Sequence, residues 1–226
     1  MIEYDDIEQR MVLKLVYYGP ALSGKTTNLR QLHEQLHSAG RGDLMVLDTM
    51  DDRTIYFDLL PFFLVAPSGL RIKVKVFTVP GQARHDATRK AVLRCADGVA
   101  FIADSQLAED RGNVSSFANL KTNLACAGLD IEQLPLVIQF NKRDLPGILS
   151  AAEIQRTWGS RGFPIIMASA GRGAGVMETF TRLLELTYDS LDKRFHLASV
   201  HGLRREEFTS RLVNCHPGER FDREDG

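Results

Sequence analysis

Residues 19–27 read GPALSGKTT, and the first eight of them fit the pattern GxxxxGK[ST]. An apolar run typical of a buried strand comes directly before this segment, at 12–18. A stretch with leucines at helical spacing follows it, at Leu29, Leu32 and Leu36. Glycines let such a backbone curl so that its N–H groups converge on phosphate oxygens, and the following helix adds its positive dipole end. A chance glycine turn is the alternative, but the flanking strand and helix favour a phosphate-binding loop.

Within this loop, two side chains have specific expected roles. Lys25 is expected to reach the β- and γ-phosphates of a nucleotide, and the Thr26 hydroxyl to bind Mg²⁺. The loop residues expected to contact the nucleotide are Gly19, Ala21, Leu22, Ser23, Gly24, Lys25, Thr26 and Thr27.

Apolar runs and amphipathic stretches alternate along the chain, which is typical of βαβ units around a parallel sheet. Strand-like runs lie at 12–18, 62–65, 71–78, 98–104, 136–141 and 164–167, with helical patterns at 26–40, 117–124 and 177–191. We therefore predict an α/β fold, a P-loop NTPase domain whose mostly parallel sheet has six or seven strands and helices on both faces.

A second motif, Asn141-Lys142-Arg143-Asp144, lies at the end of the apolar run LVIQF. Ligands of open α/β sheets bind at the carboxyl ends of the strands. The Asp144 carboxylate can accept hydrogen bonds from guanine N1–H and N2–H₂, which adenine cannot offer. A strand-terminal turn capped by Asn and Asp is the alternative. On the same sheet as the phosphate loop, the motif favours guanine, with Asn141, Lys142 and Asp144 as contacts.

Composition and the two ends of the sequence limit the partners and the cellular location that we expect for the protein. Its 28 Lys+Arg and 29 Asp+Glu residues give a net charge of −1, so no basic excess favours nucleic acid or anionic lipid. No apolar run approaches the roughly 20 residues that cross a bilayer, and neither end carries a lipidation signal. Three cysteines without CxxC spacing indicate reduced thiols. We expect a cytoplasmic protein without a lipid anchor or a nucleic-acid partner.

Together with Thr78-Val79-Pro80-Gly81-Gln82, these motifs resemble those of Ras-like small GTPases. The phrases LVYYGPALSGKTTNL, DRTIYFDLLP, FTVPGQ, DGVAFIADSQ and QFNKRDLP are similar in detail to the bacterial MglA-type GTPases. The resemblance implies a Ras-like G domain at 1–195 and leaves 196–226 as a charged C-terminal extension, partly helical or disordered. It also implies GTP and GDP as ligands, with Mg²⁺, and GTP hydrolysis that is slow without an activating partner.

The resemblance assigns catalytic roles to residues that sequence logic alone leaves open. Thr54 matches the threonine that reaches Mg²⁺ and the γ-phosphate, and the adjacent Arg53 matches the family's own arginine finger. Gln82 matches the glutamine that positions the attacking water, and Gly81 before it is counted among the nucleotide-binding residues.

The turn around Ser169 and Ala170 corresponds to the loop in which small GTPases direct a backbone N–H at guanine O6. The resemblance also implies partners: a roadblock-type homodimer that accelerates hydrolysis, and effectors that bind the GTP form. It implies a role in cell polarity or motility, with recruitment to a cell pole. Alone, the protein is expected to be a monomer.

Two positions depart from the usual Ras-like pattern. Thr78 stands where most of these proteins have the aspartate of DxxG, so Asp58 is a candidate to hold the metal's waters. Ala21 stands where glycine is usual, and its methyl points toward the space that Arg53 and Gln82 must enter, which predicts slower hydrolysis. A GTP-binding adaptor with negligible hydrolysis is therefore the alternative to a switch. A P-loop metabolite kinase fits less well, because no Arg-rich lid is evident.

Overall fold

The structure of this protein is a computed structural model, and it describes residues 3–5, 7–36, 43–47, 57–80 and 85–214. Seven strands lie side by side in the order β3 (Met45–Leu47), β4 (Phe57–Val65), β5 (Arg71–Thr78), β2 (Arg10–Tyr18), β6 (Gly98–Asp104), β7 (Leu136–Asn141) and β8 (Ile165–Met167). The five strands from β5 to β8 in this order run parallel. β3 and β4 are antiparallel additions, and β1 (Glu3–Asp5) pairs antiparallel with β2. The predicted mostly parallel sheet is confirmed.

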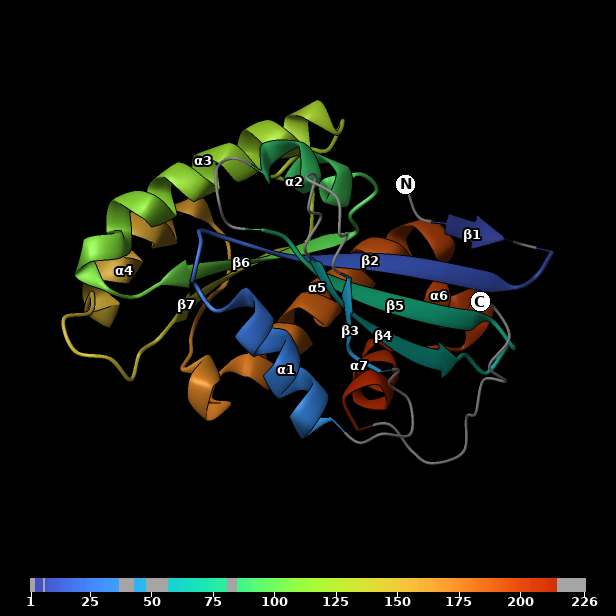
Figure 1. Cartoon of the computed structure of the whole chain (residues 1–226). Coiled ribbons are helices and arrows are strands. Elements are labelled where there is room, and N and C mark those ends of the chain that lie inside the picture. Colours follow the sequence, from blue (N-terminus) through green and yellow to red (C-terminus); the bar gives the residue numbers. More distant parts are fainter. Residues whose placement is uncertain (1–2, 6, 37–42, 48–56, 81–84, 215–226) are drawn as a thin grey trace.

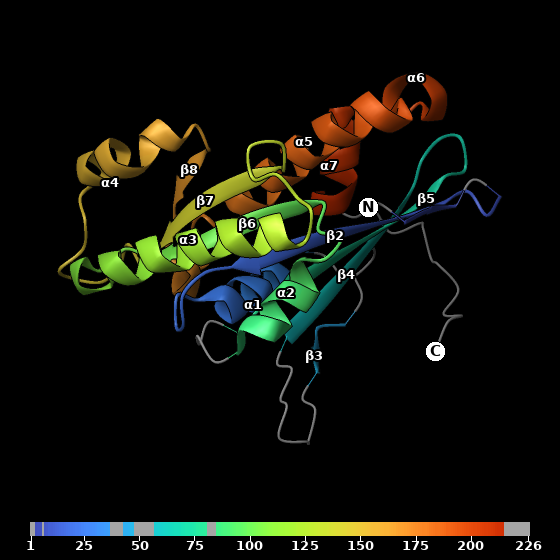
Figure 2. The same ribbon diagram turned by 90° about the horizontal axis from the view of Figure 1, so that it is seen from above.

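Helices cover both faces of the sheet (Figures 1 and 2). One layer holds α2 (Asp86–Leu93), α3 (Asp110–Cys126) and α4 (Ala151–Trp158), and the other holds α1 (Lys25–Gln35), α5 (Val176–Phe195), α6 (Leu197–His201) and α7 (Arg205–Asn214). Short 3₁₀ turns lie at η2 (Leu107–Glu109), η3 (Gly159–Arg161) and η4 (Ala170–Arg172). The helices thus enclose the parallel strands, as expected for an α/β fold.

The two layers share the central strand β2. Successive side chains of a strand point to opposite faces, so Leu13, Leu15 and Tyr17 pack under α1 and α5, whereas Val16 and Tyr18 pack under α2 and α3. All five are fully buried. A strand buried on both faces has a continuous apolar run, and such a run made β2 recognisable in the sequence.

Strand β4 begins at Phe57, five residues before the run predicted at 62–65. Pro61 lies inside it, opposite Lys75 of β5. β3 pairs with β4 only at 57–59, so beside Pro61 the outer edge of β4 has no neighbouring strand among the described residues. A proline without an N–H is tolerated at such an edge, and its presence hid the strand from a sequence reading.

The described part of the C-terminal extension is helical and packs on the sheet. Leu203, Phe208 and Leu212, the three apolar residues that share one face of this segment, are fully buried in the same core as α1 and α5. The Tyr188 hydroxyl of α5 donates a 2.7 Å hydrogen bond to the Leu203 carbonyl.

The same helices hold the turn between β4 and β5. Arg211 of α7 donates a 2.8 Å hydrogen bond to the Val65 carbonyl. His201 of α6 meets Ser68, both through its ring Nδ1 at 2.9 Å and through its carbonyl, which accepts from the Ser68 N–H at 3.3 Å. Residues up to 214 therefore share the core of the preceding domain.

Candidate functional site

The candidate site lies at the carboxyl ends of β2, β7 and β8, where three loops meet (left in Figure 1). The side chain of Asn141, which is 2% exposed, joins them. Its Nδ2 donates to the Ser23 carbonyl of the phosphate loop at 2.8 Å, and its Oδ1 accepts from the Ala170 N–H at 2.8 Å. A 2.8 Å bond on each side places the two predicted nucleotide motifs next to each other.

The phosphate loop needs glycine at two positions. Gly19 has a φ of +151°, and a Cβ there would lie 2.2 Å from the Ile102 carbonyl oxygen. Gly24, with a φ of +97°, caps the start of α1, and its Cβ would lie 2.2 Å from Asn141 Nδ2. These contacts exclude any larger residue, so the glycines serve close backbone approach as well as the turn itself.

Lys25 lies inside the curl of the loop. It is 7% exposed, and its Nζ donates to the carbonyls of Gly19 at 3.1 Å and Pro20 at 2.6 Å. Burial, followed by the nearby Arg89 charge, lowers the pKa of the Lys25 ammonium to about 8. A phosphate group within the curl would favour the charged ammonium, because an adjacent anion offsets the loss of hydration.

The start of α1 fits an anionic ligand. Its N-cap, Gly24, offers no side-chain acceptor, and its first turn holds no acidic residue, so this turn supplies no anion of its own to its backbone N–H groups. Among the described residues, no atom is hydrogen-bonded to the buried Ser23 Oγ. Thr26, the residue expected to bind Mg²⁺, is half-buried in this first turn. The described ranges contain no cluster of three or more His, Cys, Asp or Glu that could hold a metal. The Thr26 hydroxyl and the phosphate oxygens of a bound nucleotide are ligands that a magnesium ion accepts.

The base-binding side of the site carries two charged pairs. Lys142, which has a φ of +64°, pairs through Nζ with Asp104 at the end of β6. The Asp144 side chain is 23% exposed, and its Oδ2 lies 3.3 Å from Nε of the exposed Arg172. Arg172 thus partly neutralises the charge of the Asp144 carboxylate that a guanine base would contact.

The two backbone donors expected at guanine O6 are used within the protein. The Ser169 N–H donates to the Ala174 carbonyl at 2.9 Å, and the Ala170 N–H donates to Asn141 Oδ1. Both residues lie beside the NKRD turn, since Arg143 N–H donates to the Ala168 carbonyl at 2.9 Å. In this structure the turn lies next to the NKRD turn, and both of its N–H groups are bonded within the protein.

Several expected site residues lie outside the described residues: Arg53, Thr54, Gly81 and Gln82. Asp58 lies in β4, opposite Val46 of β3, and its side chain is not described. Thr78 is buried at the end of β5, opposite Tyr17. Ala21 and Leu22 of the phosphate loop are exposed.

Sequence analysis missed a buried amide network beneath the site. Asn28 of α1 and Gln139 of β7 exchange two hydrogen bonds, at 3.0 and 2.9 Å. Gln139 also donates to the Thr179 hydroxyl of α5 at 2.8 Å. Polar residues at the buried positions of an apolar strand and two helices were the available signal, because buried amides need partners.

A second network joins α2 to α3. Asp86 Oδ1 accepts from Arg89 at 3.0 Å, Asn119 at 3.1 Å and Asn123 at 3.0 Å, and its Oδ2 accepts from Lys90 at 2.8 Å. The Lys90 ammonium, followed by the amides and Arg89, holds the pKa of the Asp86 carboxyl well below its usual range. The Tyr18 hydroxyl, at the end of β2, contacts both asparagines. The helix that follows Gln82 in sequence is thus fixed to α3.

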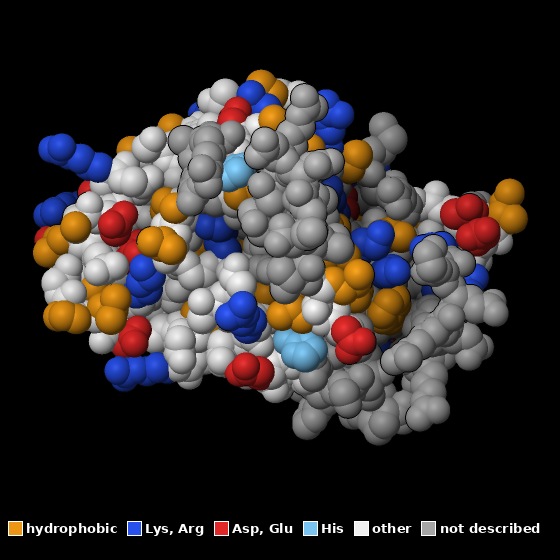
Figure 3. Space-filling model, viewed as in Figure 1, with side chains coloured by type: hydrophobic (Ala, Val, Ile, Leu, Met, Phe, Trp, Pro, Cys, Tyr) orange, Lys and Arg blue, Asp and Glu red, His pale blue; other side chains and the backbone are white. Residues whose placement is uncertain are grey.

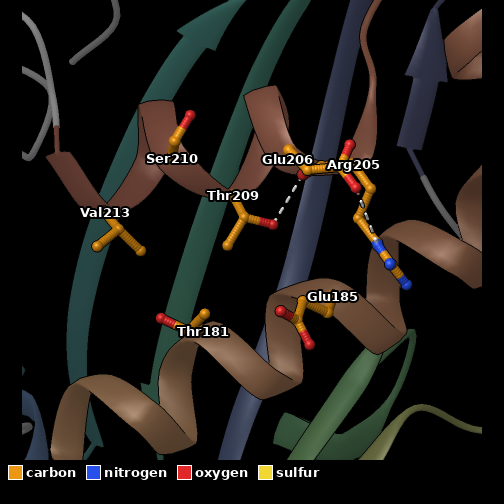
Figure 4. A pocket seen from close by; sticks show the side chains of 7 residues that line it. All are labelled: Thr181, Glu185, Arg205, Glu206, Thr209, Ser210 and Val213. Carbon is orange, nitrogen blue, oxygen red and sulfur yellow. Dashed lines mark hydrogen bonds and ion pairs between the residues drawn. The ribbon is translucent and has the colours of Figure 1, made fainter.

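A hollow lies away from this edge. It measures about 310 Å³ and lies between α5 and α7, where Thr181 and Glu185 face Arg205 and Thr209 (Figure 4). On the face seen in Figure 3, Lys and Arg side chains are interspersed with Asp and Glu. No described helix is long and apolar enough to span a bilayer.

A phosphate loop that opens a helix, joined through Asn141 to an NKRD turn on the same sheet edge, defines a small GTPase of the Ras-like class. No protein-family model matches the chain. It is 42% identical over 180 residues to the mutual gliding-motility protein MglA of Myxococcus xanthus, an alignment covering 80% of this chain and 92% of that protein. The chain belongs to the MglA family of small GTPases, and it is a GTP-binding switch protein with GTP hydrolase activity.

The chain is also similar to two more distant GTPases, each over little more than half of its length. The GTP-binding protein Rab-3D of Rattus norvegicus is 30% identical over 134 residues, 58% of this chain and 59% of its own. The ADP-ribosylation factor-like protein 4D of Homo sapiens is 27% identical over 121 residues, 51% of this chain and 58% of its own.

Proposed function

We propose that this protein controls cell polarity or motility by binding partners only in its GTP form. The position of Lys25 is the main observation that supports a nucleotide site. Its buried ammonium is held by two carbonyls of the curled loop, and an incoming phosphate could take their place. The sequence relation to the gliding-motility protein of Myxococcus xanthus supports the cellular role.

The nucleotide contacts follow from the loops at this edge. Residues 19–27 bind the phosphates, with Lys25 as the cation, while Asn141, Lys142 and Asp144 bind the base together with the turn at 169–170. Thr26 and Thr54 hold Mg²⁺, which when bound neutralises charge on the phosphate oxygens.

Hydrolysis depends on two residues outside the phosphate loop and the NKRD turn, Arg53 and Gln82. Arg53 places a permanently charged guanidinium on the oxygens that gain charge in the transition state, and Gln82 orients the attacking water. α2, which Asp86 fixes to α3, begins four residues after Gln82.

A roadblock-type homodimer is the proposed activating partner, and effectors bind the GTP form. The protein is a cytoplasmic monomer, recruited to a cell pole by these partners. Ala21, which stands where glycine is usual, favours a second candidate, a GTP-binding adaptor with negligible hydrolysis.

Binding of fluorescent GDP, GTP and ATP analogues, followed by phosphate release with and without the homodimer, tests the proposal. We expect GTP and GDP to bind and ATP not to, and equal binding of ATP would exclude the guanine site. Arg53→Ala should abolish stimulated hydrolysis, a loss of up to about 10³–10⁵ in rate, while GTP affinity stays nearly unchanged. If the parent releases no phosphate even with the partner, and Ala21→Gly restores release, the adaptor is the better description.

A further inference from the structure

The carboxylate of Asp104 forms an ion pair that the nucleotide motifs do not explain. Asp104 is the last residue of β6, directly opposite Asn141 in the ladder with β7. Its side chain is 4% exposed, and its Oδ2 lies 2.5 Å from Lys142 Nζ. A nearly buried carboxylate without a cation is unfavourable, so the pair fixes both partners.

Asp104 is itself held rigidly. Gln106 Nε2 donates to both carboxylate oxygens, at 3.1 and 3.2 Å, and the Gln106 N–H donates to Oδ1 at 3.0 Å. The buried Asn113 of α3 accepts from the Asp104 N–H at 2.9 Å and donates to its carbonyl at 2.8 Å. Every polar group of Asp104 therefore has a partner that belongs to the β6–α3 connection.

Lys142, the partner of Asp104, has a strained backbone. Its φ of +64° lies in the left-handed region, which a residue with a Cβ adopts only when its surroundings require it. It stands between Asn141, which joins the loops, and Asp144, the expected reader of guanine. An anchor on Lys142 thus fixes the turn that presents both functional side chains.

We propose that Asp104 is a positioning residue for the purine base. By holding the Lys142 ammonium at the end of β6, it stretches the four-carbon stem of Lys142 between the β6 and β7 loops. An extended lysine stem is an apolar surface, and a flat purine ring can lie against it. Asp104 acts through Lys142 and contacts no nucleotide atom itself. The inference rests on the proposed guanine site and extends it to a residue outside the NKRD motif.

This role predicts a specific pattern of nucleotide affinities. Contact with a ring face does not depend on the 2-amino group, whereas the hydrogen bonds of Asp144 do. Asp104→Asn should therefore weaken the binding of GDP and of inosine diphosphate by the same factor, at least about tenfold, by analogy with the loss of metal affinity when a group that orients a metal ligand is removed. The ratio of the two affinities should stay that of the parent.

The chain offers a matched control at the other end of the same strand. Asp97, directly before β6, has a half-buried carboxylate, and its Oδ2 accepts from the Lys14 N–H at 2.8 Å. Asp97→Asn should leave both affinities within about twofold, because it lies far from the loops. Equal losses in the two variants would show a general effect of a buried charge and would overturn the proposal.

A double variant separates positioning from a merely structural role. Lys142→Met alone should weaken GDP, and adding Asp104→Asn should weaken it no further, because the two residues act as a unit. Additive losses would overturn the proposal. If Asp104→Asn does not fold, Gln106→Ala, which loosens the carboxylate but keeps the pair, should give a smaller loss that also disappears beside Lys142→Met.

The parent protein is measured first, with fluorescent GDP and with inosine diphosphate as competitor. No GDP binding by the parent would contradict the proposed function itself. Binding by the parent that Asp104→Asn leaves unchanged would contradict the role of Asp104 alone.

Discussion

The side-chain amide of Asn141 donates to the backbone carbonyl of Ser23, so the last residue of β7 holds the phosphate loop in place from a neighbouring part of the sheet edge. The bond is buried, and a second bond from the same side chain reaches the turn after β8. One side chain therefore joins three loops that are far apart in sequence.

Asn141→Ala removes both bonds and leaves a buried carbonyl and a buried N–H without partners. Each such group costs about 1–3 kcal/mol, so we expect a lower free energy of unfolding and much faster GDP dissociation. Urea denaturation and the dissociation of a fluorescent GDP analogue measure the two effects. A destabilised variant that released GDP at the parent rate would show that the bridge serves folding alone.

Asp144→Asn should lower GTP affinity and shift selection toward xanthine nucleotides, whose C2 carbonyl cannot donate to a carboxylate. Competition between GDP and xanthosine diphosphate measures the shift. Arg172→Gln is the matched control, because the exposed pair that it breaks contributes only about 0–1 kcal/mol. An effect as large from Arg172→Gln would assign base recognition to the arginine as well.

The stability of the nucleotide-free protein should depend on Asp97. Burial raises the pKa of this carboxyl to about 6, against the opposing effects of the Lys14 N–H and of nearby charges including Arg194. The native state then holds a proton that the unfolded chain releases near pH 4, so this group makes stability fall as pH rises from about 4 to about 6. Asp97→Asn should remove that fall and increase stability at neutral pH. Denaturation midpoints at several pH values check this, and identical profiles for parent and variant would contradict it.

Phe208 connects the C-terminal helices to the core. Its ring is fully buried and lies 5.5 Å from the Tyr188 ring, centroid to centroid. Phe208→Ala should lower the free energy of unfolding by about 3–5 kcal/mol, whereas Val200→Ala on the exposed side of α6 should change it by less than about 0.5 kcal/mol. Chemical denaturation distinguishes the two. Equal, small effects would mean that the helices are only loosely attached.

The sequence predicted the parts of this fold whose signals are local. The phosphate loop and the NKRD turn combine a short pattern with a strand directly before it, and parallel strands bring both to one edge. A further local signal was available for α4, whose capping box pairs Ser150 with Glu153, and our sequence analysis did not use it.

What the sequence could not show is which distant polar residues meet. Asp104 and Lys142 are 38 positions apart, and Asn28 and Gln139 are 111 apart, so no spacing rule connects them. The packing of Phe208 and Leu212 was hidden for the same reason. Their apolar face was visible, but the sheet surface that covers it depends on the whole topology.

The close approach at Gly24 has a consequence for how this protein can change over time. A side chain at 24 would collide with the Asn141 amide, while an Asn141 substitution without that amide would lose the bond to the loop that ends at Gly24. Neither position can mutate first without loss. The phosphate loop and the NKRD turn must therefore be inherited as a single unit, and a hybrid gene that takes each of them from a different ancestor would keep the loop in place only if both ancestors shared this contact.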